Sequence, residues 1–345
     1  MSEKLDIKSM TPEELRAAAV SLGERDYRAD QIFSWLHRGA RGFGEMTNLS
    51  KALRDRLEEL YYIAPPELVS RRESKLDGTV KYLWRLWDGE CVESVVMSYK
   101  HGNTVCVSSQ AGCRMGCAFC ASTLGGLSRN LLPSEILDQV IFSESADGQK
   151  ISNIVLMGVG EPLDNYESVM RFLELVSHPG GLGVGMRHIS LSTCGLTEKV
   201  DKLGESGLQL TLSVSLHAPD DETRTRLMPV NKAGGVAALM DSCRRYFART
   251  GRRVSFEYAL IDGVNDTVKH ARELVGLLRG APWHLNLILL NHVAERELRP
   301  SGRERAAVFA EILTEGRVNF TFRRRLGADI DAACGQLRRS LTRRG

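Results

Sequence analysis

From about residue 103 onward, short apolar segments of strand length alternate with longer segments of helical periodicity. Parallel strands need long crossover connections, usually helices, so this alternation predicts a parallel sheet with helices between its strands. The fold class is therefore α/β, and a βα barrel or part of one fits the pattern. Helices are expected within 133–145, 166–177 and 236–250. Strands are expected at 104–108, 153–157, 188–193, 209–215, 254–259, 284–290 and 319–322.

Two smaller regions precede this alternation. Residues 1–66 favour short helices, because Thr11 and the proline and glutamates after it are typical of a helix start. We interpret 1–66 as a helical accessory module, which either binds nucleic acid or only caps the larger domain. Residues 67–102 alternate with a period of two, and strands expected at 80–86 and 91–97 predict a β-hairpin connector.

The composition is that of a globular protein, with 43% hydrophobic and 26% charged residues. The first ten residues are polar and no apolar run reaches the length of a membrane span, so we expect a cytoplasmic protein without a membrane partner. A net charge of +3 permits a polyanionic partner without requiring one. From Arg317 to the end, eight arginines stand against two aspartates, which suits phosphate contact and equally suits a solvated tail.

A cysteine motif follows the first strand of the alternating region. Cys113, Cys117 and Cys120 are spaced C-x3-C-x2-C, and no fourth cysteine stands at the local spacing. Three thiolates can each bind one iron of a [4Fe–4S] cubane and leave the fourth iron open. An open iron can chelate the amino and carboxylate groups of S-adenosylmethionine. The motif is expected at the carboxyl end of the strands, where barrel folds place active sites.

A zinc loop is the alternative interpretation of these cysteines. Structural zinc sites usually show two pairs of ligands, or cysteine together with histidine, and no second pair is present here. The spacing therefore favours the cluster. In a reducing compartment, clustered cysteines indicate metal binding or catalysis rather than disulfides.

Longer strings extend this motif along the chain: VCVSSQ from residue 105, MGVGEP from 157, LST from 191, SLHA from 215, FEY from 256, ND from 265 and DIDAACGQL from 329. In this order they resemble the radical S-adenosylmethionine rRNA adenine methyltransferases, the family of RlmN and Cfr. The resemblance covers nearly the whole chain from about residue 77, and the N-terminal helices resemble the family's accessory domain more weakly.

The resemblance implies a radical S-adenosylmethionine partial (β/α)6 barrel over 103–345 with a C-terminal catalytic loop, an RNA-binding domain over 1–66 and a connector over 67–102. It implies methylation of carbon 2 of adenosine 2503 in 23S rRNA, and of adenosine 37 in tRNA. An electron donor such as flavodoxin and a monomeric state are expected with it. Two alternatives remain: Cfr-like methylation of carbon 8 of the same rRNA adenosine, and a non-enzymatic iron–sulfur or zinc protein that binds RNA.

Carbon 2 of adenine is electron-poor, so it cannot attack the methyl group of a sulfonium directly, and a radical route makes chemical sense. The resemblance implies that Cys334 carries the methyl group between two S-adenosylmethionine molecules per turnover. The first methylates the Cys334 thiolate, and the second is cleaved to the radical that activates the carried methyl group. Cys106 then resolves the resulting protein–RNA adduct and forms a disulfide with Cys334, while Glu93 is the implied proton acceptor.

The resemblance also implies a set of cofactor contacts at strand ends. Glycine permits a close backbone approach and a carboxylate accepts hydrogen bonds from an ammonium group, so a Gly-Glu pair suits the cofactor's amino group. Residues 286–292 lack both prolines of the family's pattern, so the backbone near Asn291 is expected to differ. Cys91, Cys194 and Cys243 are expected to be buried packing residues. The implied contacts are Gly160, Glu161, Ser192, Ser215, Leu216, His217 and Asn291.

Overall fold

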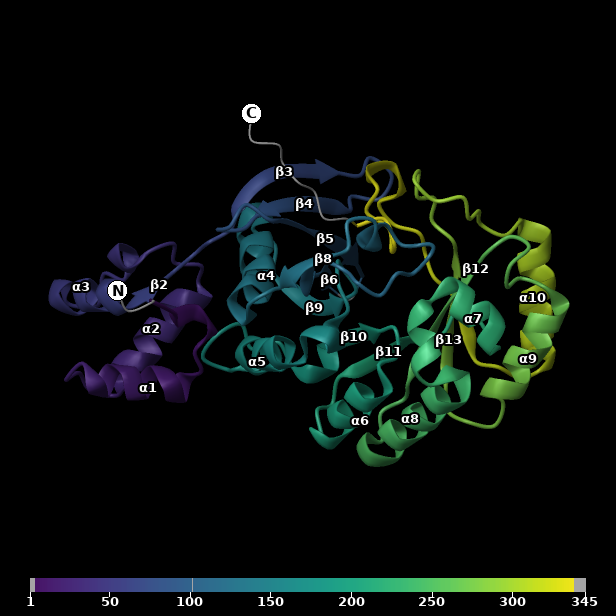
Figure 1. The fold of residues 1–345 in the computed structure, drawn as a ribbon. Helices are drawn as coiled ribbons and strands as arrows, with labels where there is room; N and C mark the ends of the chain where they lie inside the picture. Colours follow the sequence, from purple (N-terminus) through teal and green to yellow (C-terminus); the bar gives the residue numbers. More distant parts are fainter. Residues whose placement is uncertain (1–3, 101, 338–345) are drawn as a thin grey trace.

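The computed structural model describes residues 4–100 and 102–337, and its largest feature is a ten-stranded sheet. Seven strands of this sheet are parallel neighbours in chain order, as each crossover helix leads to the adjacent strand (Figure 1). All seven strands predicted from the sequence are confirmed. They are β6 (Gly102–Cys106), β9 (Ile151–Leu156), β10 (Ile189–Thr193), β11 (Thr211–Ser215), β12 (Ser255–Leu260), β13 (His284–Leu289) and β14 (Phe320–Phe322).

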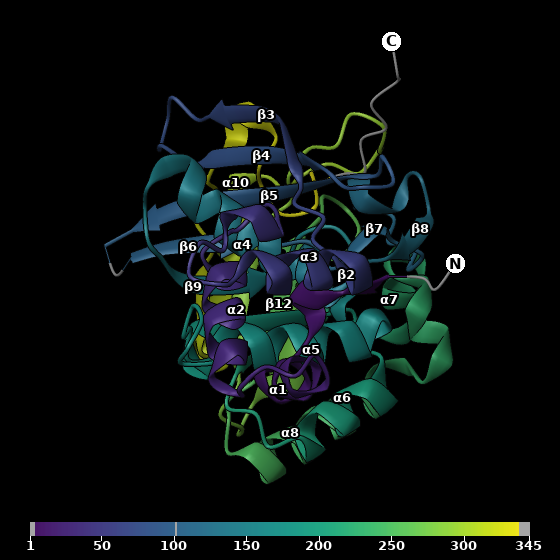
Figure 2. The same ribbon diagram turned by 90° about the vertical axis from the view of Figure 1, so that its left-hand side faces the viewer.

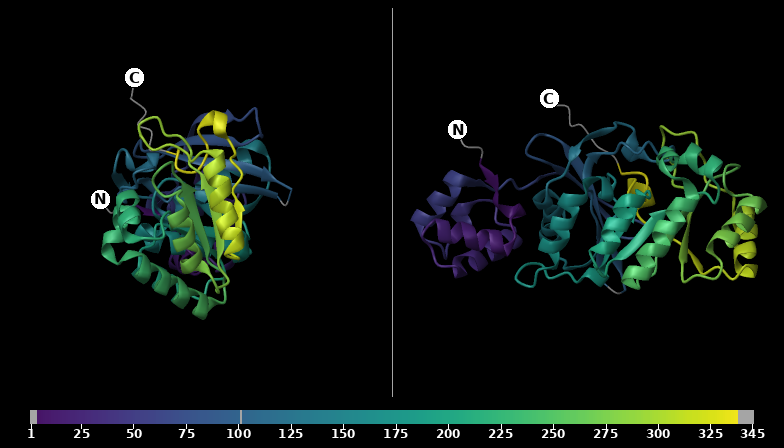
Figure 3. Two further views of the ribbon diagram at one scale, coloured as in Figure 1. Left: turned by 90° about the vertical axis from the view of Figure 1, so that its right-hand side faces the viewer. Right: turned by 60° about the horizontal axis from the view of Figure 1, so that its bottom comes forward.

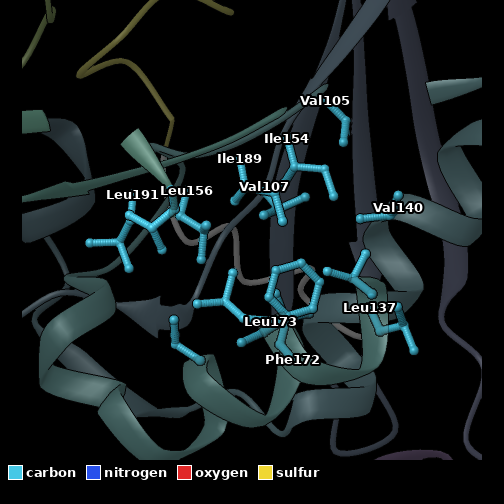
Figure 4. Close-up of a cluster of buried hydrophobic side chains, with 14 of the residues drawn as sticks. Val105, Val107, Leu137, Val140, Ile154, Leu156, Phe172, Leu173, Ile189 and Leu191 are labelled. Carbon is cyan, nitrogen blue, oxygen red and sulfur yellow. The ribbon is translucent and has the colours of Figure 1, made fainter. Parts of the chain in front are cut away.

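Helices cover the outer face of the parallel strands (Figure 3). Their inward residues pack against alternate strand residues, and Figure 4 shows the strand side chains of Val105, Ile154 and Leu191 above Val140 and Phe172 of two helices. All five side chains are buried, so this layer is a continuous apolar core. The helices are α4 (Pro133–Asp147), α5 (Tyr166–Ser177), α6 (Thr197–Glu205), α7 (Asp221–Leu227), α8 (Gly235–Thr250), α9 (Val268–Leu278) and α10 (Arg303–Glu315).

Residues 67–102, predicted to be a β-hairpin connector, contain three antiparallel strands within the described residues: β3 (Glu67–Glu73), β4 (Val80–Arg85) and β5 (Cys91–Tyr99). The expected hairpin is β4 and β5, whereas β3 was not predicted, because its sequence ELVSRRE is mostly charged and exposed. Since β5 pairs antiparallel with β6, these strands extend the barrel sheet at one edge. That 67–102 is a unit separate from 103–345 stays a prediction.

The N-terminal module is helical, as predicted, and its α-helices within the described residues are α1 (Pro12–Ser21), α2 (Tyr27–His37) and α3 (Lys51–Leu60). Thr11 caps α1 in a reciprocal capping box with Glu14, which satisfies two backbone donors at the helix start. Two short parallel strands, β1 (Leu5–Asp6) and β2 (Tyr61–Tyr62), close the module. It lies at the end of the molecule beside α4 and α5 (Figures 1 and 2).

A buried ion pair joins this module to the barrel. Lys8 Nζ lies 2.6 Å from Asp138 Oδ1 on α4, and the two side chains are 2% and 3% exposed. A second, more exposed contact is bidentate, from the Arg171 guanidinium on α5 to the Glu14 carboxylate at 2.6 and 3.0 Å. Removing one partner of a buried pair leaves an uncompensated charge, so Lys8 and Asp138 oppose separation of the two parts.

Among residues 4–100 and 102–337, no helix combines the length and the apolarity needed to cross a bilayer.

Candidate active site

The cysteine loop starts and ends in a small antiparallel hairpin of β7 (Gln110–Gly112) and β8 (Leu127–Asn130). Gly112 has a φ of 84°, and a Cβ atom there would lie 1.9 Å from the carbonyl oxygen of Gly126. The Cys113 N–H donates to that same carbonyl at 3.0 Å. Only glycine therefore allows the two ends of the loop to approach closely enough to be hydrogen-bonded.

The loop is also bonded to two distant segments. The Ala118 N–H donates to the carbonyl of Leu227 at the end of α7 at 2.9 Å. On its other side, the Ala121 N–H donates to the carbonyl of Gly335 at 2.8 Å, and Ser122 Oγ donates to that of Leu337 at 2.7 Å. The C-terminal segment that carries Cys334 is thereby fastened against the cysteine loop.

A cavity of about 160 Å³ lies at this junction. Its wall brings together the three cysteines of the loop, Cys334 and most of the predicted cofactor contacts. Leu216 is not on the wall; it is buried, and its N–H donates to the Glu257 carbonyl. The wall includes Cys113, Cys117, Cys120, Gly160, Glu161, Ser192, Ser215, His217, Asn291 and Cys334.

Gly160 places Glu161 on this wall by a close approach between two segments. Its φ is 109°, and a Cβ atom there would lie 2.6 Å from Gln110 Cβ. Because this contact is possible, Gln110 Oε1 accepts from the Glu161 N–H at 2.8 Å. The Glu161 carboxylate accepts from the N–H groups of Leu163 at 3.1 Å and Cys194 at 2.7 Å. Burial raises the pKa of this carboxyl, and those hydrogen bonds oppose the shift.

The imidazole ring of His217 is neutral, and one of its two nitrogens already accepts a hydrogen bond. Its Nδ1 accepts from the Ala259 N–H at 2.9 Å, and burial, reinforced by the Arg224 charge, lowers the pKa of the imidazole to about 3. The backbone of His217 has a φ of 55°, and Asn265 Nδ2 donates to its carbonyl at 2.7 Å. The buried Asn265 therefore holds a strained turn that presents the ring to the cavity.

The residues on this wall fit the cofactors expected from the sequence. Asn291 Oδ1 is buried without a hydrogen-bond partner within the described residues, while its Nδ2 donates to the Cys334 carbonyl at 3.0 Å. An unsatisfied acceptor and the Glu161 carboxylate on one wall suit a ligand that carries an ammonium group and hydroxyls. No three His, Cys, Asp or Glu side chains of the described chain are placed to hold one metal ion, whereas a cubane needs each thiolate on a different iron.

A second cavity of about 680 Å³ adjoins the first and shares Asn291, Arg323 and Cys334 with it. Cys106, at the end of β6, lies on its wall. Burial raises the pKa of the Cys106 thiol to about 12; Cys334 acts in the same direction and Arg323 opposes it. Both cysteines are free thiols in the structure. The fold thus brings the two predicted catalytic cysteines to one cavity.

Arg323 is a functional candidate that the sequence analysis counted only as part of the basic C-terminus. Its guanidinium lies 3.3 Å from Glu257 Oε2 and 3.4 Å from Met157 Sδ, and it lines both cavities. Interaction with Cys334 is the largest influence that raises the pKa of Arg323, and Cys106 contributes further. A partly buried cation thus lies near both cysteines, and no local sequence pattern distinguishes it from its arginine neighbours.

Glu93 lies on β5 but is not among the residues that line the two cavities. It is buried, and its Oε1 lies 3.1 Å from Lys81 Nζ. Lys81 Nζ also donates to the Asp331 carbonyl at 3.1 Å, three residues before Cys334. Figure 1 shows the yellow C-terminal segment beside these antiparallel strands. Glu93 is therefore connected to the Cys334 segment through Lys81, a partner that the sequence analysis did not identify.

Comparison with known proteins identifies both parts of the chain. Residues 107–275 match the model of the radical SAM superfamily, and residues 5–63 match that of the ribosomal RNA large subunit methyltransferase N-terminal domain. A "Probable dual-specificity RNA methyltransferase RlmN" of Lachnoclostridium phytofermentans is 51% identical over 99% of this chain and 96% of its own length. The protein of the same name from a Thermoanaerobacter species is 49% identical, over 97% and 98%. The crystal structure of a radical SAM methyltransferase from Sphaerobacter thermophilus superposes with a TM-score of 0.91 at 41% identity, covering 96% of this chain and 99% of that one.

Proposed function

The chain belongs to the RlmN family of radical S-adenosylmethionine RNA methyltransferases, and from that premise we propose that it methylates carbon 2 of an adenosine in 23S rRNA and of an adenosine in tRNA. The observation that carries the proposal is the junction of the cysteine loop with the Cys334 segment at one cavity. The dual-specificity name of the relatives supports two RNA substrates. Membership of an enzyme family leaves the non-enzymatic alternative without support.

In this proposal Cys113, Cys117 and Cys120 hold the iron–sulfur cluster, and Glu161 and Asn291 bind S-adenosylmethionine. When bound, these groups supply the methyl group and the one-electron chemistry that an unreactive ring carbon needs. The protein's own contribution is placement, since the backbone hydrogen bonds of Cys113, Ala118 and Ala121 hold the loop in place at three points. The apolar surroundings of the cavity limit the access of water to it.

The second cavity gives Cys334 and Cys106 separate roles. Cys334 accepts a methyl group at its sulfur and presents it to the adenine, beside the positive charge of Arg323. Cys106 stays protonated at rest because burial raises the pKa of its thiol to about 12. After the adenine is joined to Cys334, the Cys106 sulfur attacks the Cys334 sulfur. In this step the Cys106 thiol loses its proton, a disulfide forms, and the bond between Cys334 and the RNA-bound carbon breaks with its electron pair on that carbon, which then takes up a proton to give the methyl group.

We assign Glu93 to proton acceptance, acting together with Lys81. The carboxylate and the ammonium are 3.1 Å apart and almost fully buried, so a proton can pass between them without bulk water. Lys81 also donates to the Asp331 carbonyl, so a change in the protonation of the pair would alter a hydrogen bond that holds the segment carrying Cys334.

The position of the methyl group is the decisive test. RNA is isolated from a strain that lacks the protein, with and without its return, and adenosines are analysed by mass spectrometry against 2-methyl and 8-methyl standards. We expect 2-methyladenosine to disappear from both 23S rRNA and tRNA and to reappear on complementation. An 8-methyl product would instead establish the Cfr-like alternative, and unchanged RNA would refute the proposal.

A further inference from the structure

Arg224, on α7, is one of the largest fully buried side chains of the protein. Its guanidinium donates to Cys194 O at 2.7 Å, Ser215 O at 2.9 Å and Leu216 O at 3.0 Å. A fourth hydrogen bond, at 2.8 Å, goes to Asn231 Oδ1. All four acceptors are neutral oxygens, and three of them are backbone carbonyls that follow or end β10 and β11.

Arg224 therefore carries a buried positive charge without a direct counter-ion. Within residues 4–100 and 102–337, no carboxylate forms an ion pair with it. Asp221 interacts with it electrostatically but is bonded to Asn231 Nδ2 at 2.9 Å and to the Val236 N–H at 2.7 Å. A guanidinium stays protonated even where burial lowers its pKa, as it does here. A fold keeps such an unfavourable group only where something else offsets it.

The cysteine loop lies next to this charge. Cys194, whose carbonyl accepts from Arg224, packs in one apolar cluster with Cys117. The helix of Arg224 ends at Leu227, whose carbonyl accepts from the Ala118 N–H inside the loop. Arg224 is thus linked to the cysteine loop twice, through Cys194, which packs with Cys117, and through Leu227, which is bonded to Ala118.

We propose that Arg224 is the counter-charge of the iron–sulfur cluster and raises its reduction potential. A cubane bound by three thiolates is net negative, and reduction adds one further negative charge. A buried positive charge stabilises the reduced form more than the oxidised form, because the low-dielectric surroundings do not screen it. Arg224 is a positioning residue in this role, since its four hydrogen bonds within the described residues go to Cys194 O, Ser215 O, Leu216 O and Asn231 Oδ1 and not to a thiol sulfur.

The inference rests on the cluster that the proposed function requires. A wild-type protein that holds no cluster after anaerobic reconstitution would refute that function, whereas the role of Arg224 is tested only on clusters that form. The competing explanation is purely structural: four hydrogen bonds hold the ends of β10 and β11 in place, and the charge has no consequence.

Two variants separate charge from structure. Arg224→Gln removes the charge and keeps an amide donor, and Asn231→Asp keeps the guanidinium but places a carboxylate at Nη1. Anaerobically reconstituted proteins are compared by iron and sulfide content and by a potentiometric titration followed by electron paramagnetic resonance, without S-adenosylmethionine. The matched control is Arg245→Gln, which removes an exposed arginine of α8 that is paired with Asp201 of α6.

Both variants are expected to shift the midpoint potential to more negative values. The expected size is about a tenfold lower ratio of reduced to oxidised cluster at a fixed potential, which for one electron is about 59 mV. Arg245→Gln should leave the potential unchanged, because an exposed charge is screened. An unchanged potential in fully loaded Arg224→Gln would overturn the proposal.

If Arg224→Gln does not fold or load a cluster, Asn231→Asp decides in the same way: a more negative potential supports the proposal and an unchanged one overturns it. If neither variant holds a cluster, Arg224→Lys is decisive. Cluster content restored by lysine supports a requirement for charge. Cluster content lost with lysine as well shows that the hydrogen-bond geometry alone is needed, and the proposal fails.

Discussion

The two halves of the active site are assembled differently. The half that holds the cysteine loop takes its three thiols from one short segment, closed by the hairpin of β7 and β8. The half that holds Cys106 and Cys334 joins the end of β6 to the C-terminal segment. The loop of the first half is also hydrogen-bonded to the distant Leu227, Gly335 and Leu337, but its three thiols come from one local segment, whereas the two thiols of the second half meet only when the whole barrel is folded.

The halves also differ in how the charge of an arginine beside them is compensated; Arg224 is fully buried, and Arg323 is partly buried. Arg224 beside the loop is bonded only to neutral oxygens, so its charge remains available to the cluster. Arg323, beside the two cysteines proposed to be catalytic, is paired with Glu257, whose Oε1 accepts from Asn286 Nδ2 at 2.9 Å. Charge is therefore left uncompensated where electron transfer is expected, and is compensated where thiol chemistry is expected.

The largest expected effect compares one cysteine from each half. Cys117→Ala should lose both the cluster absorbance and RNA methylation, since a ligand is missing. Cys334→Ala should keep the absorbance and also lose methylation, because the methyl carrier is missing. Visible absorbance and methyl transfer to RNA are measured on the same reconstituted preparations. Turnover by Cys334→Ala would eliminate the carrier role and, with it, the distinction between the halves.

The second prediction concerns Cys106 within the distant half. Cys106→Ala should accumulate RNA covalently attached to Cys334, because the sulfur that releases the adduct is absent. The adduct is detected as slowly migrating RNA on a denaturing gel that disappears after protease treatment. Cys91→Ala is the matched control, as Cys91 is also a buried thiol on the sheet but lies outside both cavities. Normal turnover without an adduct would show that Cys106 does not resolve the intermediate.

The third prediction tests the compensated arginine. Glu257→Gln should lower the free energy of unfolding by about 2 kcal/mol, below the usual range for breaking a buried pair because the Arg323 side chain is 25% exposed. Urea denaturation of the cluster-free protein measures the change. Glu67→Gln removes an exposed partner of Arg85 and should change the stability by about 0.5 kcal/mol or less. Equal effects would mean that the Arg323 pair is no more buried in energetic terms than a surface pair.

The smallest expected effect is a dependence on alkaline pH. The pKa of Cys106 is about 12 in the folded protein and 9.0 without burial, so the folded state holds this proton more tightly. Its contribution to stability is complete below pH 9 and is lost as the pH rises from 9 towards 12. Cluster-free Cys106→Ala should therefore lose less stability per pH unit than the wild type, by at most about 1.4 kcal/mol. Parallel curves would contradict the burial of this thiol.

The two halves also differ in how well the sequence predicts them. The seven parallel strands were predicted because apolar segments of strand length alternate with helical ones, a signal carried by local order. The cysteine loop was predicted from the C-x3-C-x2-C spacing of its cysteines, which is also a local signal. Strand β3 was missed because its residues are exposed and charged, so only pairing with β4 makes it a strand.

Arg224 and Arg323 could not be recognised from the sequence. Each stands among other charged residues, and only tertiary packing distinguishes it from an exposed neighbour. The partnership of Glu93 with Lys81 was missed too, although the two lie on adjacent strands, because the register of β4 against β5 was unknown. Resemblance supplied the roles of Cys106, Cys334 and Glu93, whereas the charges around them come from the structure.

The buried ion pair of Lys8 with Asp138 bears on which RNA molecules the protein could bind. A movement of the module away from the barrel would have to break this buried pair, so the pair favours one placement of the module. Under the proposed function, an RNA that touches both the module and the cavity would then have to span one fixed distance, so RNAs would be selected by their shape.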